Sequence, residues 1–454
     1  MQTQRDHVHA HTFMMGRLSS ALVLGDPAGA EIPGRRAQTG LLIGIILALL
    51  VSGGFAVYGW IVPGGSTAYR RPGAILVEKE TGDRYVYLNG LLHPTPDLTS
   101  AMLIQGPAAE VTLISKNSLR DVARGAPLGL AGAPRQLPST DGFVRGPWLA
   151  CLPGSVAPGR SGSGLGVNLD PGVAADPLPA DRFVVVRDQR DVAYLLANGV
   201  KYRVDDEAVL VVLGAATVSP APAPQLWLDW LDDGPALAPA RIEGAGAPGP
   251  RVGGRAHPVG TLFRQRVESG SEQFFVLRRD GLAPMSRTEF LLADAEDEDA
   301  AVELSPAAIV DARRSADRSL LDRLPDLTPL RLLDTAGRAL CAWQRPVSAE
   351  EYASEVVLVA RSAAAVGADG KPLVLARPGA GMHVVAAPVP AQSATARTFV
   401  ISDGGIAYRL ADQATRSALK LGAVAPIPFP KDLLAAMPQG PVLSREAVTS
   451  LPRG

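Results

Sequence analysis

Histidines and acidic residues are the side chains in this sequence whose types suit acid–base chemistry or metal binding. His93, His257 and His383 are isolated from one another along the chain, which favours hydrogen-bonded structural histidines over metal ligands or catalytic bases. The run Asp294–Asp299 carries enough carboxylates to attract calcium, but it lacks the spaced ligand pattern of an EF-hand loop. We therefore expect structural histidines and a solvated acidic loop.

Two glycine-rich segments have the composition of phosphate-binding loops. Gly367–Pro372 contains a Gly-Lys pair, but a P-loop requires GxxxxGK followed by Ser or Thr after a strand. Gly162–Gly166 follows no clear strand, which favours a surface loop. The sequence also lacks HExxH and GxSxG motifs. It therefore nominates no catalytic, cofactor-binding or metal-binding residue, and no cofactor; a triad assembled in space from distant residues stays open.

A long apolar stretch near the N-terminus indicates a membrane span. Leu41–Val62 comprises 22 consecutive uncharged residues, and about 20 apolar residues suffice for a helix to cross the hydrocarbon core. Arg35 and Arg36 precede the stretch, which favours a cytosolic N-terminus under the positive-inside rule. We expect a cytosolic segment over residues 1–38, a transmembrane helix over residues 39–62, and an extracytoplasmic C-terminal part.

The two cysteines, Cys151 and Cys341, both lie in the C-terminal part. Neither belongs to a CxxC motif or has a nearby histidine that suggests a metal site. Two lone cysteines outside the cytoplasm most simply form a structural disulfide. Closing a loop of about 190 residues contributes roughly 5 kcal/mol in the chain-entropy model. Two unrelated buried thiols are the alternative.

Composition limits the class of the C-terminal part. The net charge of the whole chain is −1, which argues against a nucleic-acid partner. The 454 residues include 47 glycines and 39 prolines, whereas aromatic residues make up 5%. Hydrophobic residues make up 47%, an ordinary share for a folded protein. We expect many short elements joined by turns.

Four similar hairpin patterns predict an internal repeat. Each reads as a strand, an Asp/Gly or Asn/Gly turn and a second strand, followed in at least three copies by a helical segment. The patterns begin at Ala74, Phe183, Phe274 and Thr398. The second and fourth copies also share a later Gly-Pro step, at Gly234 and Gly440. The segments between the copies carry one cysteine and one nearby tryptophan each.

These patterns predict a single transmembrane helix followed by an α+β domain, in which a disulfide-linked central core carries four small β-rich repeat modules. The predicted modules cover residues 72–119, 181–240, 255–305 and 396–454, the last including the C-terminal segment; the two parts of the core cover residues 120–180 and 308–395.

The segment before the span predicts an amphipathic helix. Met14, Leu18, Ala21 and Leu22 fall near one helical face, and Gly25 with the following Asp and Pro ends the pattern. A short helix so close to a span is typical of an interfacial or partner-docking element. Its expected apolar anchors are the following residues: Phe13, Leu18 and Leu22.

The order of several short motifs resembles the EccB family, the single-span subunit of the type VII (ESX) secretion machinery of actinobacteria. The resemblance covers essentially the whole chain. It rests on these segments: Arg5–Phe13, Gly16–Leu22, Leu91–Pro94, Gly129–Pro134 and Pro438–Pro441.

The resemblance implies a structural scaffold subunit of the type VII secretion complex in the cell membrane, bracing the channel from the extracytoplasmic side. The implied partners are an EccC-type ATPase, an EccD-type channel, an EccE-type subunit, a mycosin protease, the lipid bilayer and a second copy of the chain. ATP hydrolysis has been suggested for some members, but no P-loop supports enzyme activity here. A membrane-tethered protein that binds the cell wall is the alternative function, and a tethered hydrolase is a third.

Overall fold

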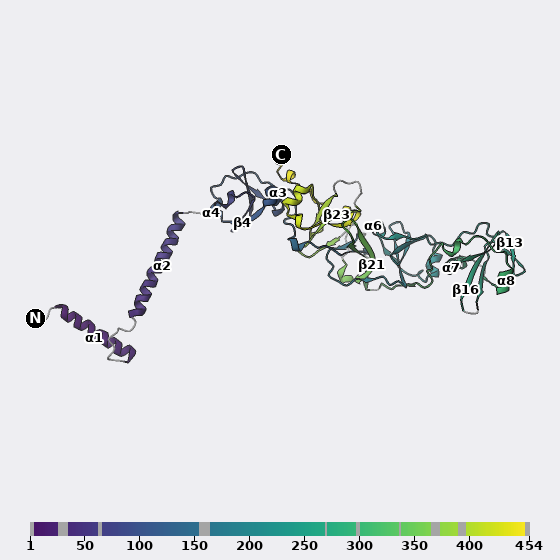
Figure 1. Ribbon diagram of the computed structural model, residues 1–454, viewed down its shortest axis with the longest axis horizontal. Coiled ribbons are helices and arrows are strands. Elements are labelled where there is room, and N and C mark those ends of the chain that lie inside the picture. Colours follow the sequence, from purple (N-terminus) through teal and green to yellow (C-terminus); the bar gives the residue numbers. More distant parts are fainter. Residues whose placement is uncertain are drawn as a thin grey trace.

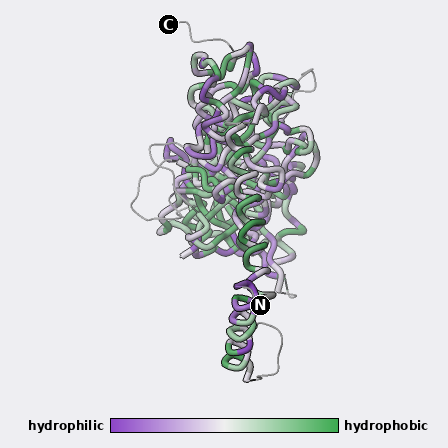
Figure 2. Tube along the Cα trace, turned by 90° about the vertical axis from the view of Figure 1, so that its left-hand side faces the viewer, coloured by the Kyte–Doolittle hydropathy of each residue, from purple (hydrophilic) through white to green (hydrophobic). Residues whose placement is uncertain are grey.

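The computed structural model describes residues 4–25, 35–61, 66–153, 164–267, 270–296, 300–335, 337–364, 373–388 and 396–449. Two helices come first, α1 (Gln4–Leu24) and α2 (Arg35–Ile61). Within α2, Ala37–Trp60 is long and apolar enough to cross a membrane, and none of it is buried against the rest of the chain. In Figure 2 the trace of α2 is mostly coloured as hydrophobic, whereas α1 carries both colours.

Helix α1 contains all three predicted docking residues, but they do not share one face. It runs without a break from Gln4, so Phe13 and Leu18 are five positions apart on one helix. At 3.6 residues per turn this spacing turns the two side chains about 140° away from each other. Phe13 therefore lies on a different face of α1 from Leu18 and Leu22.

Four segments of the C-terminal part have sheets with one strand order, and we call them units 1 to 4. In each unit four strands lie in the order third–second–first–fourth, and the sheet of unit 2 has two further short strands. The first three strands are antiparallel, and the fourth is parallel to the first. A helix connects the third strand with the fourth.

The bounds of the four units are as follows. Unit 1 contains β1 (Ala74–Glu78), β2 (Arg84–Leu88), β3 (Leu91–Thr95), α3 (Leu98–Gln105) and β4 (Glu110–Ile114). Unit 2 contains β8 (Arg182–Arg187), β9 (Ala193–Ala197), β10 (Val200–Val204), α5 (Ala208–Val212) and β11 (Ala221–Pro222). Unit 3 contains β15 (Leu262–Arg266), β16 (Glu272–Arg278), β17 (Gly281–Met285), α7 (Arg287–Glu296) and β18 (Val302–Glu303). Unit 4 contains β23 (Met382–Ala387), β24 (Thr398–Ile401), β25 (Ala407–Arg409), α9 (Gln413–Ala418) and β26 (Ile427–Pro430).

Turn and cap residues explain why these segments fold alike. Asn89 and Gly90 join β2 to β3 with positive φ angles, as do Asn198 and Gly199 between β9 and β10. Two consecutive residues with φ > 0 form the tight turn that matches the twist of a hairpin, which is why Asn-Gly recurs here. The following helix begins behind a capping side chain in units 1 and 4, because the carboxylates of Asp97 and Asp412 accept a backbone N–H of the first turn.

A six-stranded central sheet joins two segments that are distant in sequence. Its order is β22-β6-β5-β20-β21-β7. The strands are β5 (Trp148–Cys151), β6 (Gly166–Asn168), β7 (Asp176–Pro177), β20 (Arg338–Pro346), β21 (Tyr352–Ala360) and β22 (Leu373–Leu375). Strands that precede unit 2 in the sequence and strands that follow unit 3 therefore form one sheet.

Shorter elements complete the fold. The strands and bridging pieces are β12 (Asp232–Asp233), β13 (Pro248–Val252), β14 (Arg255–Pro258) and β19 (Arg331–Leu332). The remaining α-helices are α4 (Lys116–Leu119), α6 (Gln225–Leu228), α8 (Pro306–Asp311), α10 (Lys431–Ala436) and α11 (Arg445–Thr449).

The chain runs outward through the units and then returns, as Figure 1 shows along its long axis. Units 1 and 4 lie side by side at the end nearer α2, and unit 3 lies at the far end. Apolar residues of units 1 and 4 form one shared core, which includes Ile75, Leu103, Tyr408 and Leu419. Leu292 of α7 in unit 3 packs into the core of unit 2. The elongated shape is thus held by pairwise packing between neighbouring units.

Three units share a ring packed against a glycine beside the third strand. Backbone bonds place Gly125, Gly234 and Gly440 at equivalent positions opposite that strand. A Cβ added at Gly440 would overlap the Tyr408 ring; one at Gly234 would overlap Tyr202, and one at Gly125 would overlap His93. Close approach of ring and backbone therefore explains the glycine of the Gly-Pro step that the second and fourth sequence repeats share.

Gly440→Ala is expected to destabilise unit 4 by about 1–3 kcal/mol, because the new methyl group forces the Tyr408 ring out of a well-packed site. Urea unfolding of the full chain in detergent, followed by tyrosine and tryptophan fluorescence, measures the change. Gly422→Ala is the control, since a Cβ there meets no atom within 4 Å. Equal midpoints for the two variants would contradict the packing argument.

The sheets also differ from the sequence expectation in two places. The third and fourth sequence patterns begin at Phe274 and Thr398, which lie in the second strand of their units, whereas the first two patterns begin in or next to the first strand. Because one hairpin resembles another in sequence, the third and fourth patterns match strands that come one position later in their units. In addition, β23 was expected in the core but pairs with β24 and β26 of unit 4.

Candidate interaction sites and the disulfide-bonded core

Cys151 and Cys341 form the predicted disulfide bond, and it joins two neighbouring strands of the central sheet. The two residues face each other on the antiparallel strands β5 and β20, with Cα atoms 3.9 Å apart. The next pair, Leu152 and Leu340, is linked by a backbone hydrogen bond, so the cysteines occupy a pair without such bonds, where side chains approach most closely. Both cysteines are fully buried.

Tryptophans near the disulfide attach the central sheet to its neighbours. The Trp148 indole N–H donates to Gln344 Oε1 at 2.7 Å within the sheet. The Trp148 ring packs against Phe429 of unit 4 with ring centres 4.9 Å apart. From α6, which directly follows unit 2, the Trp227 indole N–H donates to the carbonyl of Ala150 at 3.0 Å. The central sheet therefore fixes units 2 and 4 through buried aromatic side chains.

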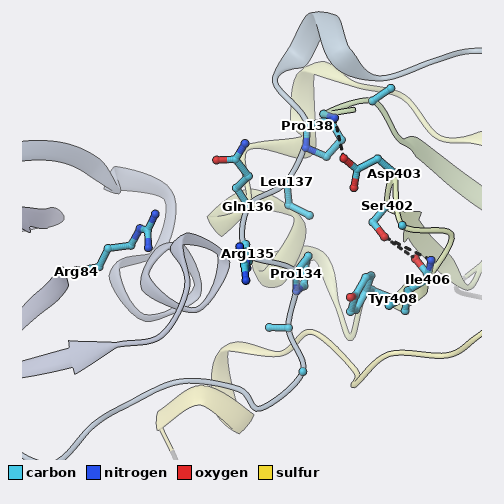
Figure 3. A pocket seen from close by; sticks show the side chains of 15 residues that line it. Arg84, Pro134, Arg135, Gln136, Leu137, Pro138, Ser402, Asp403, Ile406 and Tyr408 are labelled. Carbon is cyan, nitrogen blue, oxygen red and sulfur yellow. Dashed lines mark hydrogen bonds between the residues drawn. The ribbon is translucent and has the colours of Figure 1, made fainter. Parts of the chain in front are cut away.

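A cleft of about 590 Å³ opens where units 1 and 4 meet, and Figure 3 shows it from close by. Arg84 of β2 lies on one side, and the hairpin of unit 4 with Ser402, Asp403 and Tyr408 lies on the other. The proline-rich segment 134–138 runs between them. The Asp403 carboxylate accepts the backbone N–H of Gly379 at 2.7 Å, which fixes the hairpin tip.

The electrostatics of this cleft suit binding rather than proton transfer. Burial raises the pKa of Tyr408, and the nearby carboxylates of Asp97 and Asp403 raise it further, so the phenol stays neutral at physiological pH. Burial also raises the pKa of Asp97, although hydrogen bonds from Ser100 oppose this effect. The sequence patterns do not indicate Arg84 or Tyr408 as candidate site residues. The prolines of segment 134–138 are the sequence feature that could have indicated this cleft.

The histidines have structural surroundings, as expected from their isolation in sequence. His93 Nδ1 lies 2.8 Å from the carbonyl oxygen of Ala126, and His383 Nδ1 lies 2.6 Å from that of Val424. Burial lowers the pKa of His383. His257 packs edge-on against Phe263. Within the described ranges the structure brings together no group of three His, Cys, Asp or Glu side chains suited to a metal ion.

Other sequence candidates fall partly or wholly outside the described residues. Residues 367–372 and 162–163 of the two glycine-rich segments lie outside them, as do residues 297–299 of the acidic run. In the remaining part of that run, burial and the neighbouring Asp206 raise the pKa of Glu296.

The predicted docking residues of α1 are exposed. Phe13 is 62% exposed, Leu18 55% and Leu22 80%. Exposed apolar side chains on a helix next to a membrane-length helix are the feature expected of an element that packs against a bilayer or another protein.

These features define a class of protein, in which one membrane-length helix is joined to an elongated, disulfide-bonded, β-rich domain. The family model "Type VII secretion system ESX-1, transport TM domain B" matches residues 1–451 of the chain. The chain therefore belongs to this family, EccB, and the resemblance inferred from the sequence motifs is confirmed.

Mycobacterial relatives are similar over nearly the whole chain. The ESX-1 secretion system ATPase EccB1 of Mycobacterium tuberculosis is 27% identical over 98% of this chain and 94% of its own length. The ESX-3 secretion system ATPase EccB3 of Mycolicibacterium smegmatis is 28% identical over 97% of this chain and 89% of its own length.

Solved structures share the fold. The EccB3 dimer from the ESX-3 core complex has a TM-score of 0.59 and 25% identity, and the match covers 83% of this chain and all of that one. A chain of the periplasmic assembly from the ESX-5 inner membrane complex has a TM-score of 0.64 and 23% identity, covering 87% of this chain and all of that one.

Proposed function

We propose that this chain is a structural, membrane-anchored subunit of a type VII secretion complex, which braces the complex outside the cytoplasm. The observation that carries the proposal is the unburied apolar helix α2 attached to the elongated, disulfide-bonded domain, in a chain of the EccB family. The N-terminus is cytosolic and the domain extracytoplasmic. This orientation is supported by Arg35 and Arg36 before the span and by the disulfide, since such bonds persist outside the cytoplasm.

The proposed partners follow from this orientation. Helix α1 contacts the cytosolic parts of an EccC-type ATPase, an EccD-type channel or an EccE-type subunit, whereas the outward domain meets a mycosin protease and a second copy of the chain. The relatives support assembly, since solved structures contain EccB3 as a dimer and similar chains in the ESX-5 inner membrane complex.

The four units are proposed to be copies of one repeat module. The shared strand order and the equivalent ring–glycine pairs support this interpretation. On this basis the fourth module begins at Met382 rather than at residue 396, and the third extends through Arg314, which bridges to Leu282.

The chain is proposed to act without turnover of its own. Although the relatives carry ATPase in their names, the proposal is supported by the absence of a P-loop motif from the sequence. ATP hydrolysis by the purified full chain at about 1 per second or faster, a rate within the usual enzyme range, would contradict it.

Self-association is proposed to use the edge strand β4 of unit 1. Even-numbered residues of β4 hydrogen-bond toward β1, as the bonds from Glu110 to Gly73 and from Lys79 to Ile114 indicate. The backbone groups of Val111 and Leu113 therefore point away from the sheet. Their side chains are 51% and 63% exposed. An exposed apolar edge strand readily pairs with another strand.

The corresponding strands of the other units are less suited to pairing. β11 and β26 contain proline, and β18 has two residues, whereas β4 has five residues and no proline. Because proline lacks an N–H, it blocks a sheet edge. A second copy of the chain fits β4 well. In an antiparallel pair about a two-fold axis at Thr112, Val111 of one copy lies opposite Leu113 of the other, and the backbone groups of both residues point outward.

Val111→Lys combined with Leu113→Lys is expected to weaken self-association at least about tenfold, because charges on an edge strand oppose pairing. Analytical ultracentrifugation of the full chain in detergent measures the dimer constant. Val310→Lys with Val347→Lys is the control, since those side chains are 74% and 52% exposed and lie on other surfaces. An unchanged dimer constant in the β4 variant would place the self-contact elsewhere.

A further inference from the structure

Unit 3 carries a groove of about 720 Å³ at the end of the molecule farthest from α2. Phe275 of β16 and Pro284 of β17 contribute half-buried apolar surface, and Leu321 contributes more from the segment after α8. A volume of this size lies within the range of pockets that bind small ligands or side chains of a peptide.

The groove lies beside the position where the other three units hold a ring against a glycine. In unit 3 the backbone of Leu282 bonds to Arg313 and Ser315, just as Leu92 bonds to Ala123 and Gly125 in unit 1. By this equivalence Ala283 takes the position of the ring, and Ser315 takes the position of the glycine. Ser315 lines the groove. Unit 3 therefore has no ring at this position, and Ala283 is itself buried in a core that includes Phe290 and Leu320.

Three arginines surround the groove, and their charge is not neutralised locally. Arg287, Arg314 and Arg318 line it and are exposed. Within the part of the chain that the structure describes, no carboxylate lies within ion-pair distance of these three guanidinium groups.

The acidic residues nearby are already engaged. Asp317 pairs with Arg278 at 2.8 Å, and Glu272 pairs with Arg266 at 3.6 Å. Asp280 accepts the Ser315 hydroxyl at 2.9 Å, and this bond holds the pKa of Asp280 below its usual value. The groove therefore presents a net positive rim around an apolar floor.

We propose that this groove binds an acidic peptide segment of a partner protein, with an aromatic side chain on the apolar floor of the groove. Carboxylates of the peptide bind Arg287, Arg314 and Arg318, since guanidinium groups bind carboxylates through paired hydrogen bonds. An aromatic anchor covers Phe275 and Leu321. A purely polar polyanion would leave this apolar surface uncovered, which favours a peptide over a charged polymer.

The test uses the full chain in detergent and a short fluorescein-labelled peptide with Glu and Asp on both sides of a phenylalanine. Fluorescence anisotropy is expected to show binding that weakens with added salt. A peptide with Gln and Asn in place of the acids is expected to bind at least about tenfold more weakly. Replacement of the phenylalanine by alanine is also expected to weaken binding.

Arg314→Glu combined with Arg318→Glu is expected to reduce affinity for the acidic peptide at least about tenfold. Arg251→Glu with Arg255→Glu is the matched control, because these exposed arginines lie in the same region but do not line the groove. Circular dichroism confirms that each variant is folded.

Equal binding of acidic and neutral peptides would overturn the proposal, as would unchanged affinity in the Arg314/Arg318 variant. Displacement of the peptide by inorganic phosphate at similar concentrations would show a general anion site and would also overturn the peptide assignment. These measurements record binding by the isolated chain, so their outcome is independent of whether the chain enters a secretion complex.

Discussion

Removal of the Cys151–Cys341 bond by the double substitution C151A/C341A is expected to lower the free energy of unfolding by about 5 kcal/mol. The bond joins residues 190 apart in sequence. Units 2 and 3 lie entirely within the closed loop, so the cross-link restricts the unfolded chain over more than a third of its length. Without it, the ends of this loop are held by the pairing of β5 with β20 and by aromatic contacts such as Trp148 with Phe429.

Denaturant unfolding of the full chain, followed by tryptophan fluorescence under oxidising conditions, measures this loss. Trp148 and Trp227 are fully buried around the central sheet, so their emission reports the region that the bond joins. Reduction of the wild-type chain with a thiol reagent is expected to reproduce the variant. A difference below about 1 kcal/mol would show that the cross-link hardly restricts the unfolded state, contrary to the loop-length argument.

Local signals made much of the architecture predictable. Asn89-Gly90 and Asn198-Gly199 marked tight hairpins, because few residues other than Asn and Gly tolerate two successive positive φ angles. The two cysteines identified the strands that form the central sheet, since two lone cysteines outside the cytoplasm favour a single cross-link.

The assignment of β23 and the cleft between units 1 and 4 depend on pairing between distant segments, which a single sequence does not reveal. β23 and β24 are separated by residues 388–397, whereas residues 188–192 separate β8 from β9. The longer connection carries no tight-turn signal, so the sequence pattern places β23 in the core. The cleft beside Arg84 and Tyr408 joins units that are far apart in sequence and has no motif of its own.

The groove of unit 3 was also missed, and the reason is physical. Its walls come from β16, β17 and the segment after α8, which carries Arg314 and Arg318. These segments are apart in sequence and share no motif, so only the fold brings them together.

The docking face of α1 offers the sharpest test of how the chain enters a complex. Leu18 and Leu22 are four positions apart on α1 and share a face with Met14. All three side chains are more than half exposed. This apolar face lies on the segment that the proposed orientation puts in the cytosol, next to the span. We therefore expect it to be covered by another subunit.

Leu18→Asp combined with Leu22→Asp is expected to prevent assembly while leaving membrane insertion and the outward domain intact. Burying two unpaired carboxylates at a dry contact costs about 3 kcal/mol or more, which corresponds to roughly a hundredfold in affinity. Native gel electrophoresis of detergent-solubilised membranes, with a tag on the chain, measures its share in the large complex. Secretion of the substrates of the system is expected to fall in parallel.

Thr12→Asp combined with Ser19→Asp is the matched control. Both side chains are exposed and hydrogen-bond the helix backbone, and they lie away from the Leu18 face, so the same charge is added where no contact is expected. This variant should assemble as the wild type does. If the Leu18/Leu22 variant also assembles and secretes normally, α1 does not dock through this face; loss of assembly in both variants would point to total charge near the membrane instead. Loss confined to the Leu18/Leu22 variant would identify the face by which the chain joins the complex.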